Sequence, residues 1–244
     1  MTYRNSNTFG EFKKNFLNSP VFEYLLTDEC AEPLMIYLTG SNLTGCIDAD
    51  SDYDLCVLVR DLSKLPTHYQ RPTSWWMLYT PEARKCQIIY NDFSSIFKVS
   101  VFPQDNVGWA QFKYITDEYL FYVNPKYQRA IDLLIQYRQV ISDNALYLFG
   151  QSCALALKIP TLSDLDEKHL CTVKKLAYQL VWAGSSAAEA SIANDFLIKI
   201  KRVSFDKLTS IEQRCVVDFI NLFVQYINKY TKSALIEELE NTLC

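Results

Sequence analysis

The stretch from Ile36 to Val59, which reads IYLTGSNLTGCIDADSDYDLCVLV, most constrains the fold of this chain. Its two apolar runs, 36–38 and 55–59, are typical of buried strands. Asp52 and Asp54 stand where the second strand begins. Residues two apart on a strand point to the same face, so these carboxylates repel each other unless a cation lies between them. The pattern predicts a site for a magnesium-like ion, which prefers oxygen ligands and often brings phosphates with it.

A Gly-Ser pair lies between the two predicted strands. Gly40 can adopt a positive φ and allow a close approach to a ligand, and Ser41 is a favourable first residue for a short helix over 41–43. Backbone N–H groups at such a start suit a triphosphate, and Gly45 would close the turn. Taken separately, a Gly-Ser dipeptide and an acidic turn are ordinary loop features. Together they indicate metal-assisted phosphoryl or nucleotidyl transfer.

The order Gly40-Ser41-x-x-x-Gly45, followed by Asp52-Tyr53-Asp54, resembles the DNA polymerase β-type nucleotidyltransferase superfamily. The likeness covers residues 1–105 and is greatest to its small stand-alone bacterial and phage members. It implies that Gly40 and Ser41 contact the triphosphate of an NTP and that Asp52 and Asp54 bind Mg²⁺ or Mn²⁺. It also implies a third acid on a neighbouring strand, which would complete a two-metal catalytic site.

The sequence offers two candidates for this third acid. A strand expected over 96–102 carries no acid, and the nearest candidates are Asp92 before it and Asp105 after it. We predict Asp92 as the third metal-binding and catalytic acid, with a plain turn residue after Asn91 as the alternative. Without a third acid the general base would be missing, and the protein would bind a nucleotide without transferring it.

Composition narrows the functional classes. The net charge of −4 over 244 residues predicts no broad attraction to nucleic acid, although a short RNA end would still fit. The eight cysteines form no CxxC pair and are accompanied by only two histidines, which argues against a zinc site. The chain has no apolar signal core and no apolar run of 18 residues, which predicts a cytoplasmic protein that does not enter a membrane.

The predicted fold class is α+β: a polymerase β-like mixed sheet with flanking helices, followed by an all-α part. We expect a catalytic domain at 1–125 and a helical domain at 126–244. Hydrophobic spacing predicts two helical pieces within 9–27 that break at Ser19-Pro20, and a hairpin over 74–90. It also predicts a helix that stops at Gly150, a long helix capped by Ser210 and a tail helix over 234–243.

The helical half offers one candidate for phosphate binding. Lys174 and Lys175 lie together within a predicted helix, and related enzymes use a basic residue from this half to neutralise the triphosphate. The resemblance makes Lys175 the predicted nucleotide-binding residue, and a solvated helix face is the alternative. The first hypothesis is therefore transfer of a nucleoside monophosphate from an NTP to an acceptor hydroxyl of a small molecule, protein or RNA end. The second is a catalytically degenerate protein that binds a nucleotide or a partner in a regulatory role.

Overall fold

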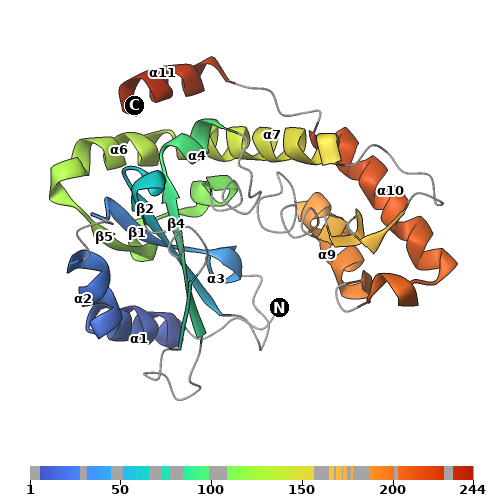
Figure 1. The fold of residues 1–244 in the computed structure, drawn as a ribbon, viewed down its shortest axis with the longest axis horizontal. Helices are drawn as coiled ribbons and strands as arrows, with labels where there is room; N and C mark the ends of the chain where they lie inside the picture. The colour runs from blue at the N-terminus through green and yellow to red at the C-terminus, as the bar shows by residue number, and fades with distance from the viewer. Residues whose placement is uncertain are drawn as a thin grey trace.

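A mixed β-sheet with helices on both faces forms the first part of the chain, and helices form the rest (Figure 1). The computed structural model describes residues 6–27, 32–44, 52–65, 73–76, 85–98, 109–156, parts of 165–177, 187–200, 203–227 and 233–243. The fold is therefore α+β, as the sequence predicts.

Five strands make up this sheet, in the order β3-β4-β2-β1-β5. They are β1 (Met35–Thr39), β2 (Tyr53–Val59), β3 (Thr73–Trp76), β4 (Lys85–Asp92) and β5 (Leu120–Val123). β2 and β4 run parallel, while the other neighbours are antiparallel. The two apolar runs form the central strands, and β3 and β4 form the predicted hairpin. β5 lies in an aromatic segment for which the sequence predicts no strand.

Helices α1 (Ser6–Leu17) and α2 (Pro20–Thr27) cover one face of the sheet (Figure 1). The Phe12 ring stacks on Tyr53 of β2 with 3.7 Å between ring centroids. The buried Ser19 separates the helices: its hydroxyl donates to the Phe16 carbonyl and accepts from Phe22 N–H. The predicted break at Ser19-Pro20 is confirmed, because this hydroxyl ends one helix and caps the next.

The other face lies under α6 (Gln128–Gln136) and α7 (Arg138–Ala156). Tyr37 of β1 packs there against the Trp109 and Phe112 rings, at centroid distances of 6.3 and 5.4 Å. Buried polar side chains attach α7 to this layer: the Ser142 hydroxyl donates to the Ala110 carbonyl. Helix α7 continues through Gly150, so the predicted stop there is wrong. A glycine within a helix lowers its stability by about 1 kcal/mol but does not by itself end the helix.

The prediction of a strand over 96–102 is wrong for the residues of this range that the structure describes. Ser94–Phe97 form helix α4, and 99–102 lie outside the described residues. The Asp92 carboxylate accepts hydrogen bonds from Ser95 N–H and the Ser94 hydroxyl. A side chain that satisfies the first N–H groups of a turn favours winding over extension, and this local bonding overrides the alternating pattern.

Two hydrophobic clusters stabilise the described residues. The first joins the sheet to α6, α7 and α11 (Ala234–Leu243) and includes Ile131 and Leu134. The second joins residues 165–177, α9 (Ala187–Ile200) and α10 (Ser210–Ile227), where the Phe196 and Phe219 rings stack at 4.2 Å. The domain boundary at 125 stays a prediction, although apolar side chains shortly after it belong to the core of the sheet.

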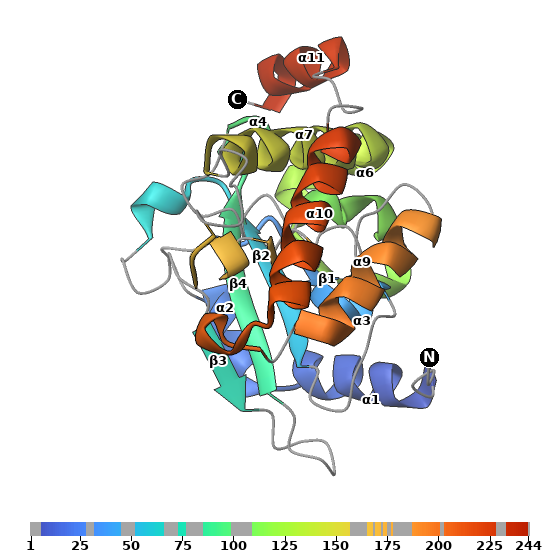
Figure 2. The same cartoon turned by 90° about the vertical axis from the view of Figure 1, so that its right-hand side faces the viewer.

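Helix α10 contacts α7 and α9, and the tail helix α11 lies near α7 (Figures 1 and 2). The short 3-10 helices are η1 (Leu62–Lys64), η2 (Phe112–Tyr114), η3 (Asp117–Tyr119), η4 (Pro125–Tyr127) and η6 (Phe205–Lys207). Within the described ranges, no helix is both long and apolar enough to cross a membrane.

Helix α10 provides the first testable prediction. Thr209, not the predicted Ser210, caps it: the Thr209 hydroxyl accepts from Glu212 N–H, and the Glu212 carboxylate accepts from Thr209 N–H at 2.8 Å. This reciprocal pair is a capping box. We expect Thr209→Ala to lower the free energy of unfolding by about 1 kcal/mol in urea titrations, and Ser210→Ala to change it much less. Equal losses in both variants would contradict this assignment.

Candidate functional site

The two halves of the Gly-Ser and Asp-x-Asp motif meet at one end of β1 and β2. In the antiparallel register, Thr39 lies opposite Asp54. Gly40 follows Thr39 directly and begins helix α3 (Gly40–Thr44), the short helix that the sequence predicts after the first strand. The chain therefore turns at Gly40 next to the Asp54 side chain, and the sheet register brings the two motif halves together.

Gly40 is required by both its backbone angle and its surroundings. Its φ is +74°, a conformation that residues with a Cβ rarely adopt. A Cβ built at this position would lie 2.0 Å from Asp54 Oδ2. The Asp54 carboxylate thus lies against the Gly40 backbone, in space that any other residue would fill.

A second contact ties α3 to the residue before β2. The Asn42 side-chain amide donates to the Asp52 carbonyl oxygen. Ser41, the residue between Gly40 and Asn42, is partly exposed, as is Asp52. Gly40, Ser41, Asp52 and Asp54, the four residues predicted from the motif, therefore lie close together in the fold.

Gln111 supports the turn from the opposite direction. It is fully buried, and its Oε1 accepts from Gly40 N–H at 2.7 Å and from the Thr39 hydroxyl at 2.8 Å. Because Gly40 N–H can only donate, the oxygen of the Gln111 amide must face it. The amide nitrogen, Nε2, is buried and has no hydrogen-bond partner among the described residues. A buried donor without an acceptor is costly, so this atom indicates where a water or ligand oxygen would be favourable.

A glutamine, not an acid, lies beside Asp54 on the next strand. In the parallel pairing of β2 and β4, Asp54 lies opposite Gln87. Both side chains are partly exposed, whereas Cys86 next to Gln87 is buried. Burial, followed by the negative charges of Asp54 and Asp52, raises the pKa of the Cys86 thiol far above its usual range. Cys86 therefore stays a neutral thiol near the acid pair.

Asp92 does not join this group. It lies opposite Val59, five residues beyond Gln87 on β4. At 3.3 Å per residue this separation is roughly 16 Å, and the odd offset places Asp92 on the opposite face of the sheet. The register therefore separates Asp92 from Asp54, and its predicted role as a third metal ligand stays a prediction that this geometry does not support.

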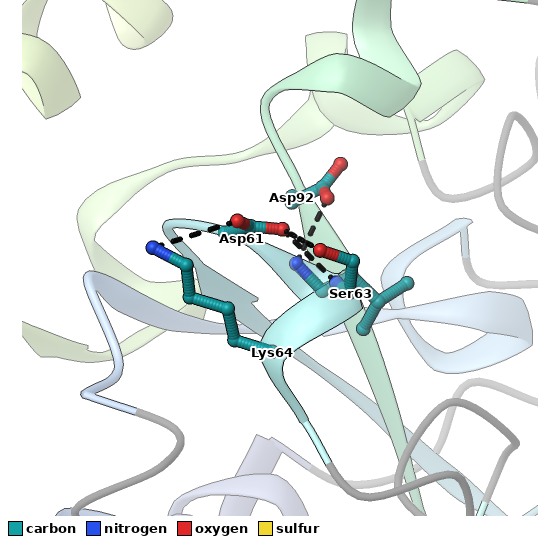
Figure 3. A network of polar contacts seen from close by, with 5 residues as sticks. Asp61, Ser63, Lys64 and Asp92 are labelled. Atoms are coloured by element: carbon teal, nitrogen blue, oxygen red, sulfur yellow. Dashed lines mark hydrogen bonds and ion pairs between the residues drawn. The ribbon is translucent and has the colours of Figure 1, made fainter.

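Asp92 instead connects segments at the far end of the sheet (Figure 3). Its side chain is buried, and its Oδ2 accepts from Leu62 N–H at 2.9 Å. Its Oδ1 accepts from Ser95 N–H, and the Ser95 hydroxyl in turn accepts from the Trp109 indole at 2.7 Å. Asp92 thus holds the turn after β2 and the start of α4 together, which is a structural role.

The remaining predicted site residue, Lys175, lies outside the described residues, as do Gly45, Asp50 and Asp105. Its neighbour Lys174 is described, and its ammonium group donates to the Val203 carbonyl oxygen at 2.7 Å. Lys174 therefore has a partner within the helical part of the chain.

Three residues near the motif are absent from the predicted site: Asn42, Gln87 and Gln111. Gln87 has a detectable signal, because it is the one polar residue in the run Cys86–Tyr90 and so marks the exposed positions of β4. Asn42 lies within the motif, but its bond depends on the tertiary turn. Gln111 lies far along the chain, and only the folded core brings it to Gly40.

Comparison with known proteins gives no further identification: no protein-family model matches the chain, and no curated protein matches it either. The residues above are therefore the basis for the proposals that follow.

The close approach at Gly40 can be tested with a matched glycine. We expect Gly40→Ala to lower the free energy of unfolding by at least about 2 kcal/mol, because a Cβ strains the backbone and displaces Asp54. Gly10 lies within α1, where a Cβ would meet nothing within 4 Å. Gly10→Ala should therefore raise the stability by about 0.5–1 kcal/mol in the same urea titration. A neutral Gly40→Ala would contradict the described turn.

The structural role of Asp92 gives a second prediction here. Asp92→Ala should lower the free energy of unfolding by about 2–4 kcal/mol, since it leaves two backbone N–H groups without their acceptor. Asp61, which caps η1, is the control, because its side chain is 38% exposed and water can replace its hydrogen bonds. Asp61→Ala should therefore lower the free energy of unfolding less than Asp92→Ala does. If a folded Asp92→Ala variant had normal stability but lost metal-dependent nucleotide binding, this assignment would be wrong.

Proposed function

We propose that this chain binds a nucleoside triphosphate together with Mg²⁺ or Mn²⁺, on a sheet of the polymerase β-like nucleotidyltransferase type. One observation carries the proposal: the Asp54 carboxylate lies against Gly40, whose positive φ and missing Cβ make that approach possible. A metal-binding acid and a turn suited to phosphate are thus adjacent.

The donor set fits a hard dication. Asp52 and Asp54 provide carboxylate oxygens, which Mg²⁺ prefers, and Mg²⁺ commonly takes one or two carboxylates together with substrate phosphates. Cys86 is a buried thiol, and a hard dication prefers oxygen ligands to sulfur. Asp52 and Asp54 would therefore hold the cation, which would neutralise phosphates that approach the backbone of Gly40 and the Ser41 hydroxyl.

The chain's own residues have distinct roles in this scheme. Gln111 and Asn42 position the turn through Gly40 N–H and the Asp52 carbonyl, respectively. Ser41 would add a hydroxyl donor to a phosphate oxygen. The buried Gln111 Nε2 offers a further donor, which would bind a water or an oxygen of the ligand.

Nucleotidyl transfer to an acceptor hydroxyl is the second candidate. The adjacent Asp52 and Asp54 favour it, because this pair is the part of the motif that would hold catalytic metal. A positioned base is also required for deprotonation of the acceptor. Asp92 lies on the other face of the sheet and Gln87 is neutral, so binding of the nucleotide is the better supported activity.

The acid pair allows a direct test. Asp52→Ala combined with Asp54→Ala should abolish Mg²⁺-dependent binding of a fluorescent, non-hydrolysable ATP or GTP analogue. We expect the Kd to rise at least about 100-fold. Asp206→Asn combined with Asp218→Asn removes the same formal charge at exposed positions of the helical part and should leave the Kd unchanged. Unchanged binding in the Asp52/Asp54 variant would exclude this site.

Release of pyrophosphate separates the two candidates. The wild-type chain is incubated with each labelled NTP and with Mg²⁺ or Mn²⁺, and both nucleotide retention and pyrophosphate are measured. Binding without release supports the nucleotide-binding function. Pyrophosphate release by the wild-type chain that disappears in the Asp52/Asp54 variant would instead establish nucleotidyl transfer as the function.

A further inference from the structure

The neighbours of Asp54 within the sheet carry no negative charge. Its position is opposite Thr39 on β1 and Gln87 on β4, and Gln87 is in turn opposite Ser74 on β3. Side chains at paired positions of neighbouring strands point to the same face, so the row across four strands contains one carboxylate. Asp52, two residues earlier in the chain, is the second carboxylate of the motif that the structure describes.

The carboxylates described in this row limit how many cations it can hold. The phosphates of the nucleotide supply oxygens to the dication that they bring, whereas a second dication a few ångströms away needs a carboxylate ligand besides the two that it would share. The described residues contain no group of three His, Cys, Asp or Glu side chains arranged to hold a metal. Gln87 presents a neutral amide where a third carboxylate would share both cations.

We infer that the acid pair binds a single divalent cation in complex with its nucleotide, and that Gln87 sets this number. The inference rests on the proposed function and deepens it: the ligand is a one-to-one complex of a dication and a nucleoside triphosphate. With one cation the site neutralises phosphate charge but lacks the second ion that a two-metal mechanism uses to activate the acceptor. The same residue therefore accounts for retention of the nucleotide without transfer.

A single substitution should change the number of cations that the site binds. Gln87→Glu replaces the amide by a carboxylate of nearly the same size at the same position on β4. We expect the variant to bind a second Mn²⁺ about tenfold or more tightly than wild type, because a third carboxylate screens the repulsion between the ions. Gln87→Met keeps the length without the charge and should bind one ion. Gln136→Glu adds a charge at the exposed end of α6 and should also bind one.

The full chain with a non-hydrolysable NTP analogue is titrated with Mn²⁺, and bound ions are counted by electron paramagnetic resonance and calorimetry. One ion in wild type and two in Gln87→Glu is the expected result. One ion in both, or two in wild type, overturns the inference but leaves the proposed function intact. No ion in wild type overturns the proposed function itself.

Without metal, the three acids of Gln87→Glu repel one another, which lowers the stability of this variant. Thermal unfolding with and without Mn²⁺ controls for this. The cation should raise the Tm of Gln87→Glu more than that of wild type or Gln136→Glu, since it removes the added repulsion. Equal Tm shifts in all three proteins would also overturn the inference.

Discussion

The contact of the Asp54 carboxylate with the Gly40 backbone is the constraint on which the site depends. It exists because β1 and β2 pair with Thr39 opposite Asp54, so the turn after β1 meets the beginning of β2. Gly40 provides the space, and the buried Gln111 fixes its N–H. Any shift of this register by one residue would turn Asp54 to the other face and separate it from the turn.

The rest of the fold keeps that register in place. Rings from α1 pack on one face of the sheet, and Tyr37, Trp109 and Phe112 pack on the other, so β1 and β2 are buried on both sides. At the far end, Asp92 binds the turn after β2 to the start of α4. The acid that the sequence assigns to the metal site thus stabilises the scaffold that carries the site.

The proposed activity follows from what surrounds the acid pair. A turn that suits phosphate and two carboxylates that suit a dication favour an NTP as ligand. Gln87, in the position next to Asp54, presents a neutral amide and not a carboxylate. Our proposal therefore assigns to this one side chain on β4 the difference between binding a nucleotide and transferring part of it.

The sequence by itself determined the two central strands, the break at Ser19-Pro20, the hairpin and the close grouping of Gly40, Ser41, Asp52 and Asp54. These features depend on local spacing, on strand alternation and on the special backbone of glycine. Only the tertiary structure decided which residues stand beside the acid pair. Strand direction and register place Gln87 next to Asp54 and send Asp92 to the opposite face, and long-range packing brings Gln111 to Gly40. Pairing between strands far apart in the chain leaves little trace in local sequence, which is why the residue beside Asp54 on β4 could not be predicted from spacing alone.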